Sequence, residues 1–419
     1  MVFFIKIKDK KVFYYLKFNK MTQEQKQLVK ATVPVLREHG VLLTTHFYQR
    51  MFTHNPELKH VFNMGNQQNG KQQMALAMAV LAYAENIENP AVLMPVVNSI
   101  GHKHTSLDIR PEHYAIVGKH LLAAISDVLE NAATPELLEA WAVAYQQLAA
   151  IMTGHEQHLY TKQVSKNAGW TGWKPFIVKQ KVKESSEITS FYLYPADGGA
   201  VADFMPGQYI SLRLFLPELN LRQPRQYSIS CAPNGKYYRI SVKRETGASH
   251  PDGMISNRLH DHTREGDVVE LSAPAGTFTL NENISRPKVF ISGGVGQTPL
   301  MAMLEALTGK QADTPITWVH GCRNEAVHAF KERLTQLAGS YSNFNHHIFY
   351  DQPEVQAQHT GWVDLSEIKT DVLQTDADYY LCGPAPFITR HYGFLVENGV
   401  DAASIHFEEF GPASLQLNN

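Results

Sequence analysis

The sequence predicts a multidomain chain with an all-α domain first, an antiparallel β-barrel domain second and a doubly wound α/β domain last. Three observations predict it. Apolar residues recur at helical spacing over the first third, and apolar and polar residues alternate in the middle. From about Pro287 apolar strands alternate with helical stretches. At 419 residues the chain has room for two to four domains, at the usual roughly 100–200 residues each.

Residues 1–20 differ from the rest of the chain. They mix aromatic residues with lysines and lack the continuous apolar stretch and small-residue cleavage site of a signal peptide. The polar segment Met21–Glu24 then opens a helix. We interpret residues 1–20 as an unstructured N-terminal extension, either an appended leader or the product of a start codon placed too far upstream. Binding to a membrane surface is the alternative.

Residues 21–160 form the predicted helical domain. Apolar residues have helical spacing in three stretches, which are Leu28–Leu36, Leu121–Val128 and Leu137–Met152. Pro111 and Pro135 lie where helices should begin, because proline is favoured in the first helical turn. The change to strand-like alternation places a domain boundary between about Tyr160 and Trp173.

Four polar side chains lie on apolar helix faces of this domain. His104 continues the face of Leu93, Val97 and Ile100, and the others are Tyr48, Gln72 and Glu156. An inward histidine is more often a hydrogen-bonded core residue than a ligand, and a helix end that reaches water would explain Glu156 equally well. A neutral imidazole that faces a pocket is also suited to axial iron ligation.

The predicted barrel domain spans residues 172–285. Alternation is clear at Ile210, Leu212 and Leu214, and again at Tyr238, Ile240 and Val242. Taken alone, Arg225–Ser228 is a strand that contains a favourable tyrosine.

The predicted α/β domain spans residues 286–419. Its first strand runs through Val289–Ser292 into Gly293-Gly294-Val295-Gly296, and a helix is expected from Pro299. Such a turn presents backbone N–H groups to a pyrophosphate, although tight packing alone also selects glycines. A second strand, Tyr379–Cys382, ends in Gly383-Pro384 and should place another loop at the same sheet edge. The sequence therefore predicts a dinucleotide site there.

Composition narrows the classes of partner. Lys+Arg of 38 against Asp+Glu of 40 gives a net charge of −2, which does not favour nucleic acid. The 3 cysteines have no metal or disulfide spacing. No apolar run reaches the roughly 18–20 residues of a membrane span. We expect a soluble, cytoplasmic monomer with small-molecule partners.

Three segments resemble the globin domain of bacterial flavohaemoglobins, namely Thr45–Leu58, Phe62-Asn63-Met64 and Lys103-His104 together with Tyr114. The resemblance runs from about Met21 to the C-terminus. It implies a globin domain at residues 21–160, followed by a ferredoxin-reductase-like pair formed by an FAD-binding barrel at 172–285 and an NAD(P)H-binding domain at 286–419.

The resemblance implies one haem b, whose iron His104 would hold. Tyr114 and Glu156 would orient that imidazole and make it more electron-donating, and Lys103 would tune the haem potential. Phe62 would pack on the porphyrin. The oxygen pocket would be formed by Tyr48, Gln72 and Leu76.

The resemblance also implies FAD and NAD(P)H as cofactors. The flavin would be bound by Tyr209, Arg225, Gln226, Tyr227, Ser228 and Ser256. The nicotinamide dinucleotide would be bound by Gly294, Val295, Gly296, Gln297, Thr298, Pro299, Cys382, Gly383 and Pro384. In the C-terminal segment formed by Glu409, Phe410, Gly411 and Pro412, Phe410 would cover the flavin, whereas the role of Glu409 is open because relatives often have a small or apolar residue there.

The implied activity is that of a nitric oxide dioxygenase, which turns NO and O2 into nitrate and so detoxifies nitric oxide. The alternatives are a haem-based oxygen sensor or carrier, and a flavin or haem reductase with other acceptors. Arg323, after the second strand of the α/β domain, leaves the choice between NADH and NADPH open. Rates, side activities and any lipid in the oxygen pocket lie beyond the sequence.

Overall fold

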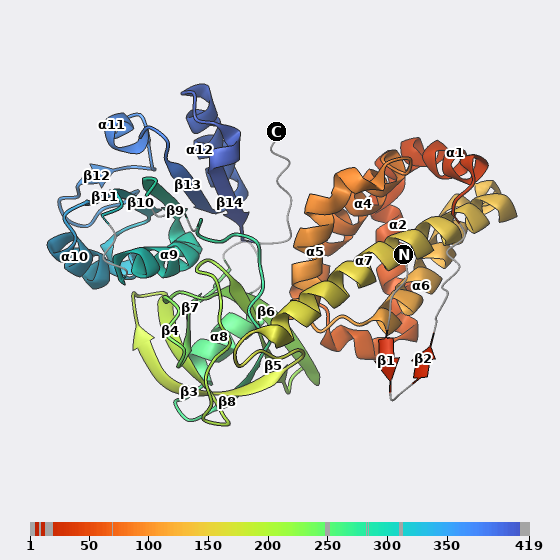
Figure 1. Cartoon of the computed structure of the whole chain (residues 1–419), viewed down its shortest axis with the longest axis horizontal. Coiled ribbons are helices and arrows are strands. Elements are labelled where there is room, and N and C mark those ends of the chain that lie inside the picture. Colours follow the sequence, from red (N-terminus) through yellow and green to blue (C-terminus); the bar gives the residue numbers. More distant parts are fainter. Residues whose placement is uncertain are drawn as a thin grey trace. The chain divides into compact units, whose positions relative to one another are not determined.

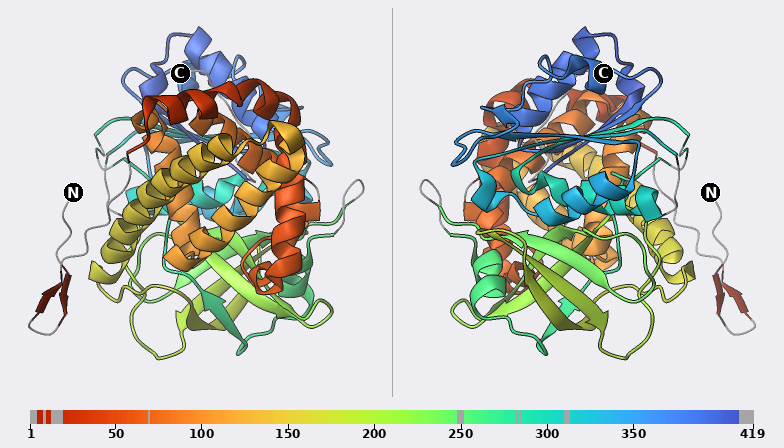
Figure 2. Two further views of the ribbon diagram at one scale, coloured as in Figure 1. Left: turned by 90° about the vertical axis from the view of Figure 1, so that its right-hand side faces the viewer. Right: turned by 90° about the vertical axis from the view of Figure 1, so that its left-hand side faces the viewer.

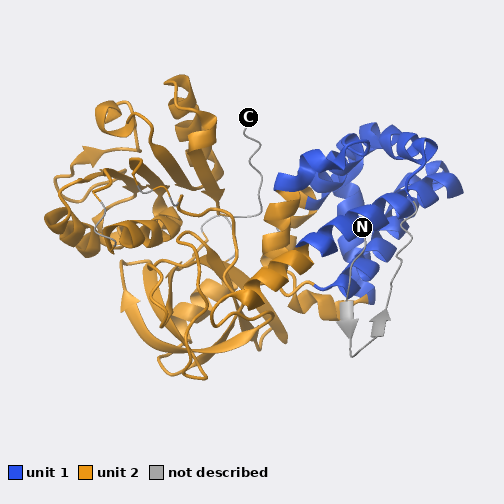
Figure 3. Cartoon of the chain, viewed as in Figure 1, with its two compact units in different colours: residues 1–54, 76–95, 110–155 blue, residues 55–75, 96–109, 156–419 orange. Residues whose placement is uncertain are grey.

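The computed structural model describes residues 5–7, 10–12, 20–68, 70–247, 252–281, 283, 285–309 and 313–410. The chain forms two compact units (Figure 3). Unit 1 contains residues 1–54, 76–95 and 110–155, and unit 2 contains residues 55–75, 96–109 and 156–419. Residues 55–75, 96–109 and the C-terminal end of the helical region from residue 156 thus belong to the same unit as the barrel and α/β domains. The predicted boundaries at 160, 172 and 286 stay a prediction.

Helices fill the chain from residue 23 to residue 165 (Figure 1). The α-helices are α1 Gln23–Ala31, α2 Val33–His54, α3 Met64–Gln68, α4 Lys71–Glu85, α5 Met94–Ser106, α6 Pro111–Leu129 and α7 Pro135–Ser165. Short 3-10 turns lie between them, namely η1 Pro56–His60, η2 Pro90–Leu93 and η3 Glu130–Ala132.

Local chemistry explains several of these boundaries. The predicted starts at Pro111 and Pro135 are confirmed, since α6 and α7 begin there. Helix α1 begins with a capping box in which Thr22 and Gln25 each bind the other's backbone N–H, at 3.0 and 3.1 Å. Leu93 was expected to lie on the same helix as His104. This was wrong, because Leu93 lies in η2, one residue before α5. The ring of Pro95 removes the N–H that would extend α5 backwards.

The N-terminal residues contain two short strands, β1 Ile5–Ile7 and β2 Lys10–Val12. They pair antiparallel, with Lys6 opposite Lys11. Residues 1–4, 8–9 and 13–19 lie outside the described residues. The interpretation of residues 1–20 as an unstructured extension therefore stays a prediction.

The predicted antiparallel barrel is confirmed. Its strands run in the order β6-β5-β8-β3-β4-β7, and a bridge between Ile229 and Ile240 joins the two ends (Figures 1 and 2). The elements are β3 Lys174–Lys183, β4 Ile188–Pro195, β5 Tyr209–Leu216, β6 Leu221–Ser228, β7 Tyr238–Lys243, α8 Met254–Asp261 and β8 Val268–Leu271. Alternate side chains fill the interior because successive residues of a strand point to opposite faces.

The predicted α/β domain is also confirmed. Its six strands are parallel, in the order β12-β11-β10-β9-β13-β14. The strands are β9 Lys288–Gly293, β10 Ile316–Cys322, β11 Phe344–Tyr350, β12 His359–Thr360, β13 Asp378–Gly383 and β14 Ile405–Glu409. The helices and turns are η4 Gly294–Gly296, α9 Gln297–Gly309, η5 Glu325–Val327, α10 Lys331–Ser340, α11 Lys369–Val372, α12 Ala385–Glu397 and η6 Ala402–Ser404.

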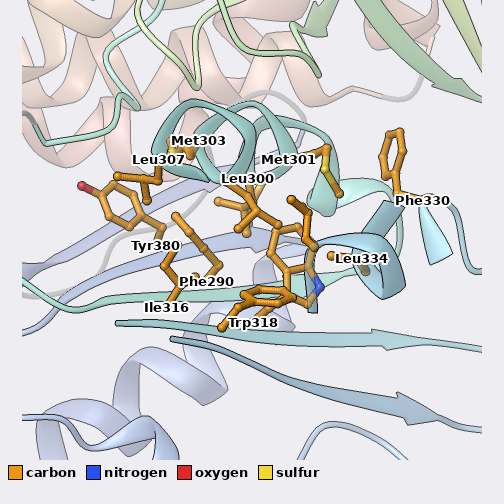
Figure 4. Packing of buried hydrophobic residues seen from close by; sticks show 14 of the residues in the cluster. Phe290, Leu300, Met301, Met303, Leu307, Ile316, Trp318, Phe330, Leu334 and Tyr380 are labelled. Atoms are coloured by element: carbon orange, nitrogen blue, oxygen red, sulfur yellow. The ribbon is translucent and has the colours of Figure 1, made fainter. Parts of the chain in front are cut away.

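Both faces of this parallel sheet are buried. Phe290 and Trp318 pack with Leu300 and Met301 of α9 and with Leu334 of α10 (Figure 4). The opposite side chains of the same strands pack against α11 and α12, and this second cluster includes Val289, Ile291, Val319, Val372, Ile388 and Leu395. Burial on both faces matches the near-continuous apolar runs of these strands. None of the described helices is long and apolar enough to cross a membrane.

Candidate functional site

His104 lies in the last turn of α5, and Glu156 of α7 fixes its ring. The His104 Nδ1 to Glu156 Oε1 distance is 2.7 Å, and the Glu156 side chain is only 3% exposed. Because a carboxylate only accepts hydrogen bonds, Nδ1 carries the proton and Nε2 keeps its lone pair. This tautomer is suited to metal ligation by Nε2. The arrangement lies wholly within unit 2.

The helix that carries His104 is also bonded to the barrel on both sides of it. Two residues earlier, His102 Nδ1 accepts from the backbone N–H of Gly276, at 3.1 Å. Two residues later, Ser106 Oγ accepts from Ser211 Oγ, at 2.9 Å, and both serines are fully buried. We call these two bonds the α5 clamp. None of the clamp residues carries a local sequence signal for this role.

A second set of hydrogen bonds joins η1 and α3 to β6. The amide of Gln223 accepts from Met64 N, at 3.0 Å, and donates to Lys59 O, at 2.7 Å. The Gln223 side chain is fully buried. Phe62, the expected porphyrin contact, is partly buried between η1 and α3. This glutamine was also missed, because its partners lie about 160 residues earlier in the chain.

The expected flavin residues gather at the end of β6. Arg225 and Tyr227 lie on one face of the strand, and Ser228 pairs with Tyr209 of β5. Burial lowers the pKa of the Arg225 guanidinium and raises that of the Tyr227 phenol. Arg225 Nη1 donates to Pro224 O, at 2.7 Å, which holds the fork on the strand. Gln226 is exposed.

The start of α8, which contains the expected flavin residue Ser256, contacts β6. Gly253 precedes Met254, and a Cβ at Gly253 would lie 2.4 Å from Ser256 Oγ, so only glycine fits. Ser256 Oγ donates to Gly253 O, at 3.0 Å, and is nearly buried. The Ser256 side chain therefore stabilises the turn by donating to its backbone carbonyl.

The two dinucleotide loops meet at one edge of the parallel sheet, as predicted. A Cβ at Gly296 would lie 2.2 Å from Cys382 O, so the Gly294–Gly296 turn touches the loop after β13. Gly294 has φ +57°, and a Cβ there would meet open space. Helix α9 begins at Gln297 rather than at the expected Pro299, because the 3-10 turn leads directly into it.

Two neighbouring polar side chains in this loop region differ in their hydrogen bonding. Thr298 Oγ1 donates to Val295 O, at 3.0 Å. The Gln297 amide is 1% exposed, and neither its oxygen nor its nitrogen has a hydrogen-bond partner among the described residues. Pro384 is the N-cap residue of α12, and a Cβ at Gly383 would lie 3.1 Å from the ring of Phe387. An orphaned buried amide beside two glycine-lined loops fits a bound dinucleotide.

The last described strand runs along the same edge. In the register of β13 with β14, Glu408 lies opposite Cys382 and Glu409 opposite Gly383. Burial raises the pKa of the Glu408 carboxyl to about 8 and raises the pKa of the Cys382 thiol well above its usual value. Phe410 is 38% exposed. Gly411 and Pro412 lie outside the described residues.

The other expected haem residues divide between the units. In unit 1, Tyr48 of α2 is 4% exposed, and its ring lies edge-on to Phe47, with centroids 4.8 Å apart. Leu76 and Tyr114 also belong to unit 1, and the Tyr114 carbonyl accepts from Tyr145 Oη, at 2.6 Å. Gln72, in the first turn of α4, and Lys103 belong to unit 2. Burial lowers the pKa of the Lys103 ammonium.

A further ion pair joins the barrel to the α/β domain. Arg239 of β7 and Glu305 of α9 are 10% and 13% exposed, with Nη2 and Oε1 3.1 Å apart. Arg239 also donates to the Ser230 carbonyl, and Glu305 accepts from Ala232 N. At the loop after β10, Arg323 donates to Glu187 of the barrel. These pairs carry no local sequence signal.

Comparison with known proteins gives the same three parts. The Globin model matches residues 45–152, the oxidoreductase FAD-binding domain matches 175–280, and the oxidoreductase NAD-binding domain matches 290–391. A flavohemoprotein of Bordetella parapertussis is 53% identical over 398 residues, which cover 93% of this chain and 98% of the relative. One from Rhizobium meliloti is 49% identical over 401 residues, 94% of this chain and 98% of the relative.

Solved structures agree. A flavohemoglobin of Malassezia yamatoensis with bound FAD and heme matches with a TM-score of 0.82 and 26% identity, over 93% of this chain and 99% of that one. The FAD/NAD-binding domain of a nitric oxide dioxygenase from Vibrio cholerae matches with a TM-score of 0.54 and 41% identity, over 57% of this chain and 99% of that one. The expected haem, FAD and nicotinamide cofactors are thereby confirmed. It follows that this chain belongs to the flavohaemoprotein family, in which a globin is fused to FAD-binding and NAD-binding oxidoreductase domains.

Proposed function

We propose that this protein is a nitric oxide dioxygenase that uses NAD(P)H, FAD and haem to turn NO and O2 into nitrate. One observation carries the proposal: the iron-ligand candidate His104, with its orienting Glu156, lies in the same compact unit as the flavin and dinucleotide segments. A sensor or carrier of oxygen would need no such reductase. The similarity of the reductase part to the Vibrio nitric oxide dioxygenase domain adds support.

The proposed reaction needs one electron per turnover, which the three-part chain can deliver. NO and O2 together contain the atoms of nitrate, and adding one electron gives the nitrate anion. One NAD(P)H therefore serves two turnovers, provided that its hydride is divided into single electrons. Bound FAD would supply that division, and bound haem would supply the iron at which the gases react.

The chain's own residues bind and orient these groups. His104 Nε2 would hold the iron, while Glu156 keeps the proton on Nδ1 and increases the electron donation of the ring. Arg225 would meet the flavin pyrophosphate, and the N–H groups of Gly294–Gly296 would meet the nicotinamide dinucleotide. Tyr114, Lys103, Phe62, Gln72 and Leu76 keep the roles that the family resemblance implies.

Tyr48 is the residue we expect to act on oxygen. Its phenol, in a buried position, would donate a hydrogen bond to the oxygen as negative charge develops on it. Tyr48→Phe keeps the ring and removes only the donor. The oxygen dissociation rate should rise about 5–30-fold if the bond contributes 1–2 kcal/mol. Stopped-flow oxygen release measures it, and an unaltered rate would contradict the role.

The activity itself is tested by an NO electrode with the purified protein, NADH and air-saturated buffer. NO consumption should stop when either O2 or NADH is withheld, and nitrate should appear in step with the NO consumed. A rate of NADH oxidation that does not depend on NO would instead indicate a reductase with another acceptor. Cytoplasmic location and a monomeric state belong to the same proposal, and gel filtration tests the latter.

A further inference from the structure

Two histidines and two carboxylates form a chain at the edge of the parallel sheet, far from His104 in sequence. His347 of β11 and His359 of β12 face each other, with Nδ1 of the first 3.2 Å from Nε2 of the second. The outer nitrogen of each ring meets a carboxylate. His347 Nε2 lies 2.9 Å from Asp371 of α11, and His359 Nδ1 lies 3.4 Å from Glu367. We call the two imidazoles the histidine pair.

The two inner nitrogens share one hydrogen bond. The Asp371 carboxylate accepts from His347 Nε2, so His347 Nδ1 keeps a lone pair and accepts the hydrogen of His359 Nε2. Glu367 lies 3.4 Å from His359 Nδ1, the nitrogen that can carry the hydrogen in the other tautomer. A metal ion that replaces the single inner hydrogen would therefore meet a lone pair on each ring.

We infer that the histidine pair binds one divalent transition-metal ion of the imidazole-preferring class, such as Zn²⁺, between His347 Nδ1 and His359 Nε2. Two Zn–N bonds of about 2.0–2.1 Å across a 3.2 Å separation enclose an angle of about 100°, close to tetrahedral. Each ligand already has the carboxylate partner that metal-bound histidines usually have. This inference is independent of the proposed dioxygenase activity.

The surroundings hold the rings in place. The side chains of His347 and His359 are 10% and 17% exposed. The ring of Phe349 stacks on His359, with centroids 4.3 Å apart and planes 16° apart. Fixed rings avoid the entropy cost of ordering ligands on binding.

Water completes the coordination. Within the described ranges, no group of three or more His, Cys, Asp or Glu side chains is placed to hold a metal ion. Asp371 and Glu367 are 39% and 52% exposed, so solvent reaches the site. The metal is exchangeable as a result, which distinguishes the site from a closed structural zinc site with four protein ligands.

The site would fasten the edge of the sheet. Strand β12 pairs with β11 through only two residue pairs, Phe349 with His359 and Tyr350 with Thr360. A metal bound to both strands adds a link that the unfolded chain lacks. Binding should therefore stabilise the folded state.

The experiment compares zinc retention by the full chain and three variants, using equilibrium dialysis against ZnCl2 at pH 7.5 with zinc measured by atomic absorption. His347→Gln and His359→Gln each remove one inner nitrogen. His346→Gln is the matched control, because His346 points to the opposite face of β11, where its ring stacks on Phe344. The wild type and the control should each hold one more zinc per chain than the other two variants.

Equal zinc in all four proteins would overturn the inference and leave the pair with its hydrogen bond alone. Because His359 lies on a two-residue edge strand, His359→Gln decides the matter even if His347→Gln does not fold. A second measurement separates a ligand role from a packing role: Asp371→Asn and Glu367→Gln should retain the zinc stoichiometry and weaken its affinity about 10–100-fold. Unchanged affinity in both would also contradict the site.

Discussion

At the scale of single residues, the fold changes the acid–base behaviour of Glu408. Its Oε2 has no hydrogen-bond partner among the described residues, and burial raises the pKa of its carboxyl from 4.5 to about 8. Between these two values the folded state keeps a proton that the unfolded state has released. The stabilisation from this group is therefore complete below about pH 4.5 and is lost as the pH rises through 8.

Glu408→Gln, which is permanently neutral, should escape that loss. We expect the variant to exceed the wild type in free energy of unfolding by about 2–5 kcal/mol at pH 9, and to match it at pH 4. Urea unfolding at the two pH values measures the difference. A gap of the same size at both would mean that Gln packs better, not that a proton is involved.

His104→Ala should abolish haem retention while flavin content stays normal, since it removes the nitrogen that Glu156 prepares for iron. His102→Ala is the matched control on the same helix and should retain haem. The absorption spectrum of each purified protein reports both cofactors. An unchanged haem content in His104→Ala would show that His104 is a hydrogen-bonded core histidine and not the iron ligand.

At the scale of elements, the α5 clamp links the iron-ligand helix to the barrel. Ser106→Ala removes one bond and His102→Ala the other. Each bond contributes about 0.5–1.5 kcal/mol, so loosening it should slow flavin-to-haem electron transfer by about 2–12-fold. Stopped-flow reduction by NADH should show an unchanged flavin phase and a slower haem phase. Ser340→Ala, on the remote α10, is the control, and an equal slowing there would remove the clamp from the explanation.

The elements also show what the sequence can and cannot predict. Helix starts at Pro111 and Pro135, the two alternating strands of the barrel and the meeting of the loops at Gly296 and Cys382 follow from local rules, because proline, alternation and glycine act within a few residues. The bonds of Gln223 to Lys59 and Met64 had no such signal. A glutamine on a strand is ordinary until its distant partners are known.

The candidate site divides in the same way. The sequence pattern placed His104 and Glu156 on apolar helix faces, and the family resemblance implied that Glu156 orients the ring; the two side chains meet in the structure. The α5 clamp could not be predicted, since serine and histidine are common at helix ends that simply reach water. Leu93 was misplaced because a 3-10 turn and an α-helix share nearly the same apolar spacing over one turn.

At the scale of the whole molecule, we propose that coenzyme choice involves two domains at once. Arg323 would suit the extra phosphate of NADPH, and in the structure it donates to Glu187 of the barrel. Glu187→Gln should free the guanidinium and raise the preference for NADPH over NADH by about 1.4–5-fold, the range for an exposed ion pair. Steady-state kinetics with both coenzymes measure the ratio. The double variant with Arg323→Ala should lose the gain, and a gain that persists would assign it to another residue.

The α5 clamp has a mechanical consequence. The two hydrogen bonds lie on either side of His104 along the helix, so they hold the imidazole in a fixed position relative to the barrel. Arg225 lies on a strand of that same barrel. Electron tunnelling falls off steeply with distance, so two hydrogen bonds that tie the iron-ligand helix to the barrel also limit how far the distance between these two residues can vary.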